Sequence, residues 1–133
     1  MKNGEALYIV IPAYNEAENI ADCVNGWYPI VQRHDGNGRS RLVVVDDGSK
    51  DDTLRLLREL AAERPLLEPL TKPNGGHGPA VLFGYRHAIA RGADYIFQTD
   101  SDGQTNPDEF EAFWENRLDC DAVLGYRPHR GDG

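Results

Sequence analysis

The stretch that decides the fold is Leu42-Val43-Val44-Val45-Asp46-Asp47-Gly48-Ser49. Its apolar half is continuous, which is typical of a strand covered on both faces and therefore of a parallel sheet. Its polar half is typical of a turn. Because Asp52 follows Ser49 by three residues, we expect a capping box that begins a helix here, with the leucines at 54, 57 and 60 along one face.

The same alternation of strand and helix continues in both directions from this stretch. Further strands are expected at residues 7–11, closed by Pro12, and at residues 66–70, 95–99 and 122–124. Other helices are expected from Glu16 to Pro29, which kinks or ends the first one, and at residues 79–91 and 106–114. The sequence therefore predicts one α/β domain with an open, mostly parallel sheet flanked by helices.

Composition and charge restrict the possible functions. The 133 residues are 40% hydrophobic, as in an ordinary globular domain, and carry a net charge of −8. That charge argues against a nucleic-acid-binding protein, which needs basic residues to neutralise phosphates. Neither a membrane helix, a signal peptide nor a disulfide framework is evident. We expect a cytoplasmic protein with Cys23 and Cys120 reduced, the alternative being a single bridge between them.

The polar and glycine-rich segments all follow predicted strands. Ligands of open α/β sheets bind at the carboxyl ends of the strands, so these segments are expected to meet on one rim. The candidate ligand-binding residues of that rim are Pro12, Ala13, Tyr14, Glu16, Asp46, Asp47, Asn74, Gly75, Asp100, Ser101, Asp102 and Arg127.

Asp100 and Asp102 are the candidate metal ligands. Mg²⁺ and Mn²⁺ prefer oxygen ligands and commonly combine one or two carboxylates with substrate phosphates. A bound cation would also offset the repulsion between a diphosphate and this acidic chain. The alternative is that both carboxylates only form turns or helix caps, and their spacing does not decide between the two.

Other rim residues also have a functional and a purely structural interpretation. Asp47 is a candidate acceptor for the N3–H of uracil or for the N1–H and amino group of guanine, whereas Asp and Gly also simply make turns. Tyr14 is a candidate stacking partner for the base or a packing residue. His77 is interpreted as a loop residue and not as a catalyst. Arg127, followed by Arg130, is a candidate phosphate ligand or part of a solvated tail.

Taken in order, these segments resemble family 2 glycosyltransferases, which have the GT-A fold. The resemblance rests on residues 9–16, 44–53, 74–80, 99–104 and 125–127, and it extends over nearly the whole chain. The last two segments are most similar to the dolichyl-phosphate mannose synthase and polyprenyl-phosphate sugar transferase branch. His77 stands where the family often has a basic residue.

This resemblance implies the Rossmann-like, nucleotide-binding part of a GT-A fold and an inverting transfer of a sugar from UDP or GDP, dependent on Mg²⁺ or Mn²⁺. It also implies a polyprenyl-phosphate or glycan acceptor, and a site of action in the cytoplasm or at the cytoplasmic face of a membrane. It assigns the nucleoside to Pro12, Tyr14, Glu16 and Asp47, ribose or metal to Asp100, metal and diphosphate to Asp102, and phosphate to Arg127.

The family's fold normally continues beyond the point where this sequence stops. We therefore interpret residues 1–133 as a single nucleotide-sugar-binding domain that is truncated at its C-terminus. Membrane contacts are then expected in the missing segments. No residue is assigned as a catalytic base, and the chain alone is expected to bind a nucleotide without necessarily turning over.

Three other protein classes compete with this interpretation. A haloacid-dehalogenase-like phosphatase is suggested by Asp102-Gly103-Gln104-Thr105, but that class carries its motif after the first strand and not after the fourth. A receiver domain would have a Lys where Arg127 stands. A non-catalytic nucleotide-sensing or assembly module with the same fold is compatible with the sequence, and donor hydrolysis or transfer by the full-length protein would exclude it.

Overall fold

The computed structural model describes residues 5–35, 38–101 and 107–115. Within them, four strands form one parallel sheet in the order β3-β2-β1-β4. The strands are β1 (Leu7–Ala13), β2 (Arg41–Asp46), β3 (Leu67–Thr71) and β4 (Tyr95–Gln98). The helices are α1 (Ile20–His34), α2 (Thr53–Ala61), α3 (His77–Ala90) and α4 (Pro107–Glu115). The predicted α/β class and parallel sheet are confirmed.

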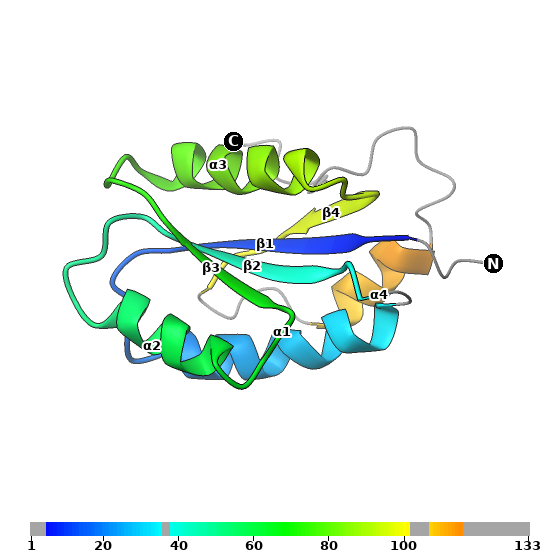
Figure 1. The fold of residues 1–133 in the computed structure, drawn as a ribbon, viewed down its shortest axis with the longest axis horizontal. Helices are drawn as coiled ribbons and strands as arrows, with labels where there is room; N and C mark the ends of the chain where they lie inside the picture. Colours follow the sequence, from blue (N-terminus) through cyan, green and yellow to red (C-terminus); the bar gives the residue numbers. More distant parts are fainter. Residues whose placement is uncertain (1–4, 36–37, 102–106, 116–133) are drawn as a thin grey trace.

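The sheet is the middle of three layers. Among the described helices, α3 covers one face, and α1, α2 and α4 lie across the other (Figure 1). Successive β1 side chains alternate between the two faces: Leu7, Ile9 and Ile11 join the cluster under α1, while Tyr8 and Val10 join the cluster under α3. Every residue of β1 is buried, which is why its sequence is apolar without alternation.

Helix α3 packs very closely on the sheet. A Cβ at Gly84 would lie 2.5 Å from Cγ1 of Val10 and 3.2 Å from Cγ2 of Val45. Ala80 and Ala88, one turn before and after Gly84, are fully buried in the same cluster. Small residues on this side of the helix therefore set its distance from β1 and β2.

The strand order places a topological switch point between β1 and β4. The chain moves from β1 to β2 and β3 on one side and then returns to add β4 on the other. Pairing between β1 and β4 ends at Val10↔Gln98, and the N–H of Thr99 donates to the carbonyl of Val10. The backbone of Pro12 lies on the same edge of β1 as that of Val10, toward β4. Because Pro12 comes after the last β1–β4 pair, its lack of an N–H removes no hydrogen bond between these strands. A crevice at this point is where such sheets bind ligands.

The alternative in which Pro29 ends the first helix was wrong, and so was the predicted cap of the second; that Pro29 kinks the first helix stays a prediction. Pro29 does not end the first helix, because α1 runs from Ile20 through it to His34. Burial of Ile30 and Val31 against the core after the proline favours continuation and offsets the roughly 3 kcal/mol that an interior proline costs. Ser49 does not cap the second helix, which begins at Thr53 after Asp52. The Ser49 hydroxyl bonds another loop instead, as described below.

Helix α1 also begins at Ile20, four residues after the expected Glu16, whereas the other described boundaries lie within two residues of prediction. Strands β3 and β4 and helices α3 and α4 overlap residues 66–70, 95–99, 79–91 and 106–114. The strand expected at residues 122–124 lies outside the described residues, as does Cys120. Cys23 forms no disulfide with another described residue and is partly buried against the core. In the part of the chain that the structure describes, no helix is both long and apolar enough to cross a membrane.

Candidate functional site

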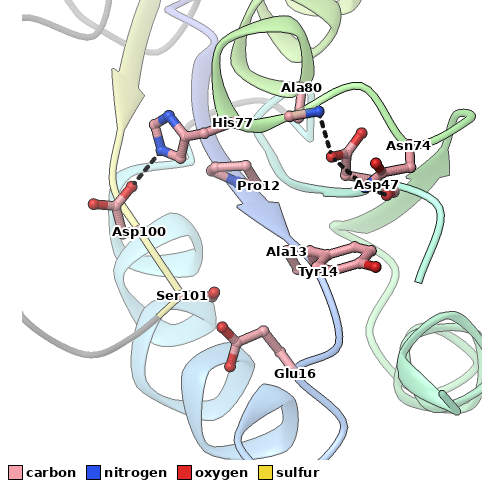
Figure 2. Close-up of a pocket in the computed structure, with 11 residues that line it drawn as sticks. Pro12, Ala13, Tyr14, Glu16, Asp47, Asn74, His77, Ala80, Asp100 and Ser101 are labelled. Atoms are coloured by element: carbon pink, nitrogen blue, oxygen red, sulfur yellow. Dashed lines mark hydrogen bonds and ion pairs between the residues drawn. The ribbon is translucent and has the colours of Figure 1, made fainter. Parts of the chain in front are cut away.

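A cavity of about 330 Å³ lies at the carboxyl ends of β1, β2 and β4, between the loops that follow them. This volume falls within the range of small-molecule sites. Figure 2 shows the side chains that converge on it from four separate segments. Eight are predicted rim residues, joined by Gly76, His77 and Ala80: Pro12, Ala13, Tyr14, Glu16, Asp47, Asn74, Asp100 and Ser101.

Asp47 is a lining residue whose carboxylate is fully engaged by the loop after β3. Its Oδ1 accepts hydrogen bonds from Nζ of Lys72 at 2.9 Å and from the N–H of Gly75 at 3.0 Å. Its Oδ2 accepts from the N–H of Gly76 at 2.9 Å and from Nδ2 of Asn74 at 3.2 Å. A carboxylate offers about four acceptor positions, so recognition of a base by Asp47 requires one of these donors to be displaced.

Three of these four donors also affect the charge state of Asp47. Burial by itself would raise the pKa of this carboxyl group. The hydrogen bond from Lys72, followed by those from Gly76 and Gly75, outweighs burial and holds the pKa of Asp47 below its ordinary value. The residue is therefore an ionised, 4% exposed anchor that fixes the Asn74–Gly76 turn against β2.

Asp46, the other member of the acidic pair, does not line the cavity. Its Oδ2 accepts a hydrogen bond from the hydroxyl of Thr71 at 2.9 Å, and its Oδ1 accepts one from the N–H of Ser49 at 3.2 Å. Asp46 is only 2% exposed. The two carboxylates thus have different structural roles. Asp46 accepts a hydrogen bond within its own turn, and Asp47 holds the loop after β3.

The loop after β1 is fastened to the loop after β2 by a row of hydrogen bonds that we call the loop clasp. The N–H of Asn15 donates to Oγ of Ser49 at 2.8 Å, and the N–H of Glu16 donates to Oγ1 of Thr53 at 2.8 Å. The N–H of Ala17 donates to Oδ2 of Asp51 at 3.2 Å. Three successive backbone donors are thereby satisfied from the neighbouring loop.

Two further hydrogen bonds stabilise the clasp, one donated in the opposite direction and one within the loop after β2. The side-chain oxygen of Asn15, a residue with φ of 55°, accepts a hydrogen bond from the N–H of Lys50 at 2.8 Å. The hydroxyl of Thr53 donates to Asp51, and this bond is the main reason why the pKa of Asp51 lies below its ordinary value. The clasp therefore sets where Tyr14 and Glu16 lie along the cavity.

Asp100 lies opposite these loops, at the end of β4. Its Oδ1 is 3.0 Å from Nε2 of His77 and accepts a hydrogen bond from Nε2 of Gln98 at 3.0 Å. Figure 2 shows the imidazole and the carboxylate pointing toward one another, to the left of Pro12. Both contacts use the same oxygen, so no described residue donates to Oδ2.

The residues that would complete a metal site are not all described. Asp102 and Arg127 lie outside the described residues, and those described contain no group of three or more carboxylate, histidine or cysteine ligands. Asp100 lines the cavity, and its Oδ2, to which no described residue donates, has the donor chemistry that Mg²⁺ and Mn²⁺ prefer. The described half of the predicted metal site thus fits a hard cation.

Sequence reasoning missed several residues of the site. His77 was expected to be a loop residue, but it is the first residue of α3 and lines the cavity. Lys72 and Thr53 were not singled out. Lys72 could have been found from the sequence, because a single lysine directly after a strand of an acidic chain indicates an ion pair with a carboxylate on the same rim. Thr53 could not have been found in this way, because its partner is a backbone N–H that lies 37 positions away in the sequence.

The sequence matches the model of the family described as glycosyl transferase family 2 over residues 8–133. It is 33% identical to the UDP-N-acetylglucosamine–dolichyl-phosphate N-acetylglucosaminyltransferase of Methanococcus voltae over 116 residues, which cover 77% of this chain and 43% of that protein. It is 31% identical to the undecaprenyl-phosphate mannosyltransferase of Micrococcus luteus over 119 residues, covering 89% of this chain and 46% of that protein.

The structure is similar to that of a mannosyltransferase from Pyrobaculum calidifontis in complex with GDP-Man and Mn²⁺. The TM-score is 0.61 at 26% identity, covering 75% of this chain and 29% of that one. The chain thus spans less than half the length of each protein compared. The family match, the curated relatives and the fold agree, and the chain belongs to glycosyl transferase family 2.

Proposed function

We propose that residues 1–133 are the donor-binding part of a longer, metal-dependent, inverting glycosyltransferase. In this proposal a sugar moves from UDP or GDP to a polyprenyl phosphate. The observation that carries the proposal is the cavity at the switch point between β1 and β4, which gathers eight predicted donor-site residues from four separate loops. Relatives named for transfer to dolichyl and undecaprenyl phosphate support the acceptor class.

The lining suits the parts of a nucleoside diphosphate. Tyr14 is 42% exposed on the cavity wall, and its ring offers a stacking surface for a base. Helix α3 begins at His77, which also lines the cavity, and the N-terminus of a helix favours a diphosphate. Asp47 meets the nucleoside either directly, after displacement of one of its donors, or through the Asn74–Gly76 turn that it holds.

Asp100 and Asp102 are proposed to hold a divalent cation, either Mg²⁺ or Mn²⁺. When bound, the cation would stabilise the departing diphosphate as a Lewis acid. On this proposal, His77 has to leave Oδ1 of Asp100 if that oxygen is also to face the cation. A mannosyltransferase of similar fold solved with GDP-Man and Mn²⁺ supports a divalent cation as a cofactor.

The proposed reaction is a direct displacement at the anomeric carbon. An oxygen of the acceptor phosphate forms a bond to that carbon, while the bond from the carbon to the diphosphate breaks and its electron pair leaves with the nucleoside diphosphate. Attack from the face opposite the leaving group inverts the configuration. The acceptor phosphate is already anionic, so the step requires no strong base. The role of the described residues is to bind and orient the donor.

Calorimetric titration of the chain with UDP and with GDP, each with and without Mn²⁺, tests the proposal. We expect one of the two nucleotides to bind only when Mn²⁺ is present. Asp102→Ala should abolish this metal-dependent binding while the protein still folds. Tyr14→Ala should weaken binding. Ile89→Ala is the matched control, because it removes an apolar side chain of similar exposure from the far end of α3.

Absence of binding to both nucleotides, with metal present, would contradict a donor site in this chain. Metal-dependent binding without sugar transfer by the longer protein would instead favour a non-catalytic nucleotide-binding module. Mass spectrometry of a polyprenyl phosphate incubated with donor and the longer protein separates these two cases.

A further inference from the structure

Helix α3 carries an apolar surface that faces outward. Among the described residues, four large hydrophobic side chains are exposed, and three of them belong to this helix: Leu82 at 46%, Phe83 at 38% and Ile89 at 57%. The fourth is Tyr14, which lines the cavity. Isolated exposed hydrophobic residues are ordinary, but three on the outward side of one helix indicate a binding surface.

The same surface has no negative charge. Its exposed residues are Pro79, Leu82, Phe83, Arg86, Ile89 and Ala90, which we call the outer face of α3. No described carboxylate pairs with Arg86. The sequence contains no Asp or Glu between Glu68 and Asp94, although 22 acidic residues occur in the chain.

The two other long helices show what an ordinary solvent face of this protein contains. The exposed positions of α2 include Arg55 and Glu59, which pair with each other, and those of α1 include Asp22. The outer face of α3 differs from both in having large apolar residues and a cation without a described acidic partner. Binding to an anionic bilayer increases with the apolar area that is buried and with the attraction between basic residues and the lipid headgroups, and this face offers both.

The position of α3 connects this surface to the cavity. The helix begins at His77 and reaches Ala80 within its first turn, and both residues line the cavity. Figure 1 shows α3 by itself on its side of the sheet among the described helices. A bilayer against its outer face would therefore lie beside the rim where the donor is proposed to bind.

We propose that the outer face of α3 docks on an anionic membrane surface, with Leu82, Phe83 and Ile89 entering the interface and Arg86 contacting lipid headgroups. The proposal extends the proposed function, because a polyprenyl phosphate is held in a bilayer and its phosphate emerges at the surface. It places membrane contact within this chain, in addition to any contact made by other segments.

Flotation with vesicles tests this docking. The chain is mixed with vesicles of phosphatidylcholine containing phosphatidylglycerol and, separately, with vesicles of phosphatidylcholine alone. We expect binding to the anionic vesicles that weakens with added salt. Arg86→Glu should lower the partition coefficient by roughly tenfold or more, and so should the double change Leu82→Ser with Ile89→Ser. These side chains are exposed, so the variants should keep the wild-type circular dichroism and thermal midpoint.

Arg58→Glu is the matched control, since it reverses an exposed charge on α2, on the opposite side of the sheet. Equal losses in Arg58→Glu and Arg86→Glu would overturn the assignment to α3, as would failure of the wild-type chain to bind anionic vesicles. Self-association that the Leu82 and Ile89 changes abolish, seen by sedimentation without vesicle binding, would assign the face to a second copy and also overturn it.

Nucleotide titration of the same proteins separates this proposal from the proposed function. Variants that lose vesicle binding but keep the wild-type affinity for nucleotide and metal support a docking surface distinct from the donor site. A wild-type chain that binds vesicles but neither nucleotide supports the docking surface and contradicts the donor site.

Discussion

Nζ of Lys72 lies 2.9 Å from Oδ1 of Asp47, and the two side chains are 14% and 5% exposed. Nζ also donates to the carbonyl of Pro73 at 2.6 Å. This buried pair joins the end of β2 to the loop after β3, directly beside the proposed donor cavity. A buried ion pair is costly to break from one side, because the remaining charge loses its counter-ion; Asp47 would keep only the donors from Asn74, Gly75 and Gly76.

Removing the cation of this pair should destabilise the fold. We expect Lys72→Met to lower the free energy of unfolding by roughly 1.5–3 kcal/mol, the range for a hydrogen bond to a charged group. Urea denaturation followed by circular dichroism measures the change. Lys50→Met, at an exposed position of the preceding loop, should remain within about 0.5 kcal/mol of wild type. Equal effects of the two changes would show that the ion pair is not what Lys72 contributes.

The low pKa of Asp47 makes stability depend on pH in a defined direction. Burial raises this pKa, but the bonds from Lys72, Gly76 and Gly75 lower it by more, so the folded value lies below the ordinary 3.8. The stabilisation is therefore complete above the unfolded pKa and is lost as pH falls through the folded pKa.

Asp47→Asn should make the protein less stable near neutral pH and should flatten the decline of stability in acid. Urea denaturation at a series of pH values, from about 7 down to about 3, measures both effects. Asp22→Asn, at an exposed position of α1, is the control. An unchanged acid slope in Asp47→Asn would contradict the assignment.

The loop clasp predicts a difference between two substitutions of one buried residue. Thr53→Val keeps the shape of the side chain but leaves the N–H of Glu16 without its acceptor and removes the hydroxyl bond to Asp51, whose Oδ1 keeps the N–H of Thr53. It should cost about 1–3 kcal/mol and weaken nucleotide affinity. Thr53→Ser retains the hydroxyl and should restore that affinity, which calorimetry measures. Equal affinities of the two variants would show that the clasp does not position the donor loop.

Two glycines of α3 should respond oppositely to alanine. Gly84→Ala places a Cβ 2.5 Å from Cγ1 of Val10 and should cost about 1–3 kcal/mol through overpacking. Gly78→Ala meets nothing within 4 Å and removes the helix penalty of glycine, so it should stabilise by up to about 1 kcal/mol. Thermal unfolding of the two variants distinguishes them, and a loss of stability in both would contradict the proposed packing.

Element type was predictable where local pattern and tertiary environment agreed. Runs such as Leu42–Val45 are apolar at every position because both faces of the sheet are covered, and that property is visible without coordinates. The end of the first helix was harder to predict, because an interior proline such as Pro29 usually kinks or ends a helix. Burial of Ile30 and Val31 against the core overrides that preference.

The sequence by itself determined the class of fold and the rim on which the site lies. Both follow from local patterns: strand and helix periods, and polar residues directly after strands. Only the tertiary structure decided how each rim residue is used: Asp46 turns inward to Thr71, Asp47 holds the neighbouring loop, and Ser49 bonds Asn15 instead of capping a helix. The physical reason is that a short polar side chain takes whichever partner folding brings within about 3 Å, and those partners are distant in the sequence.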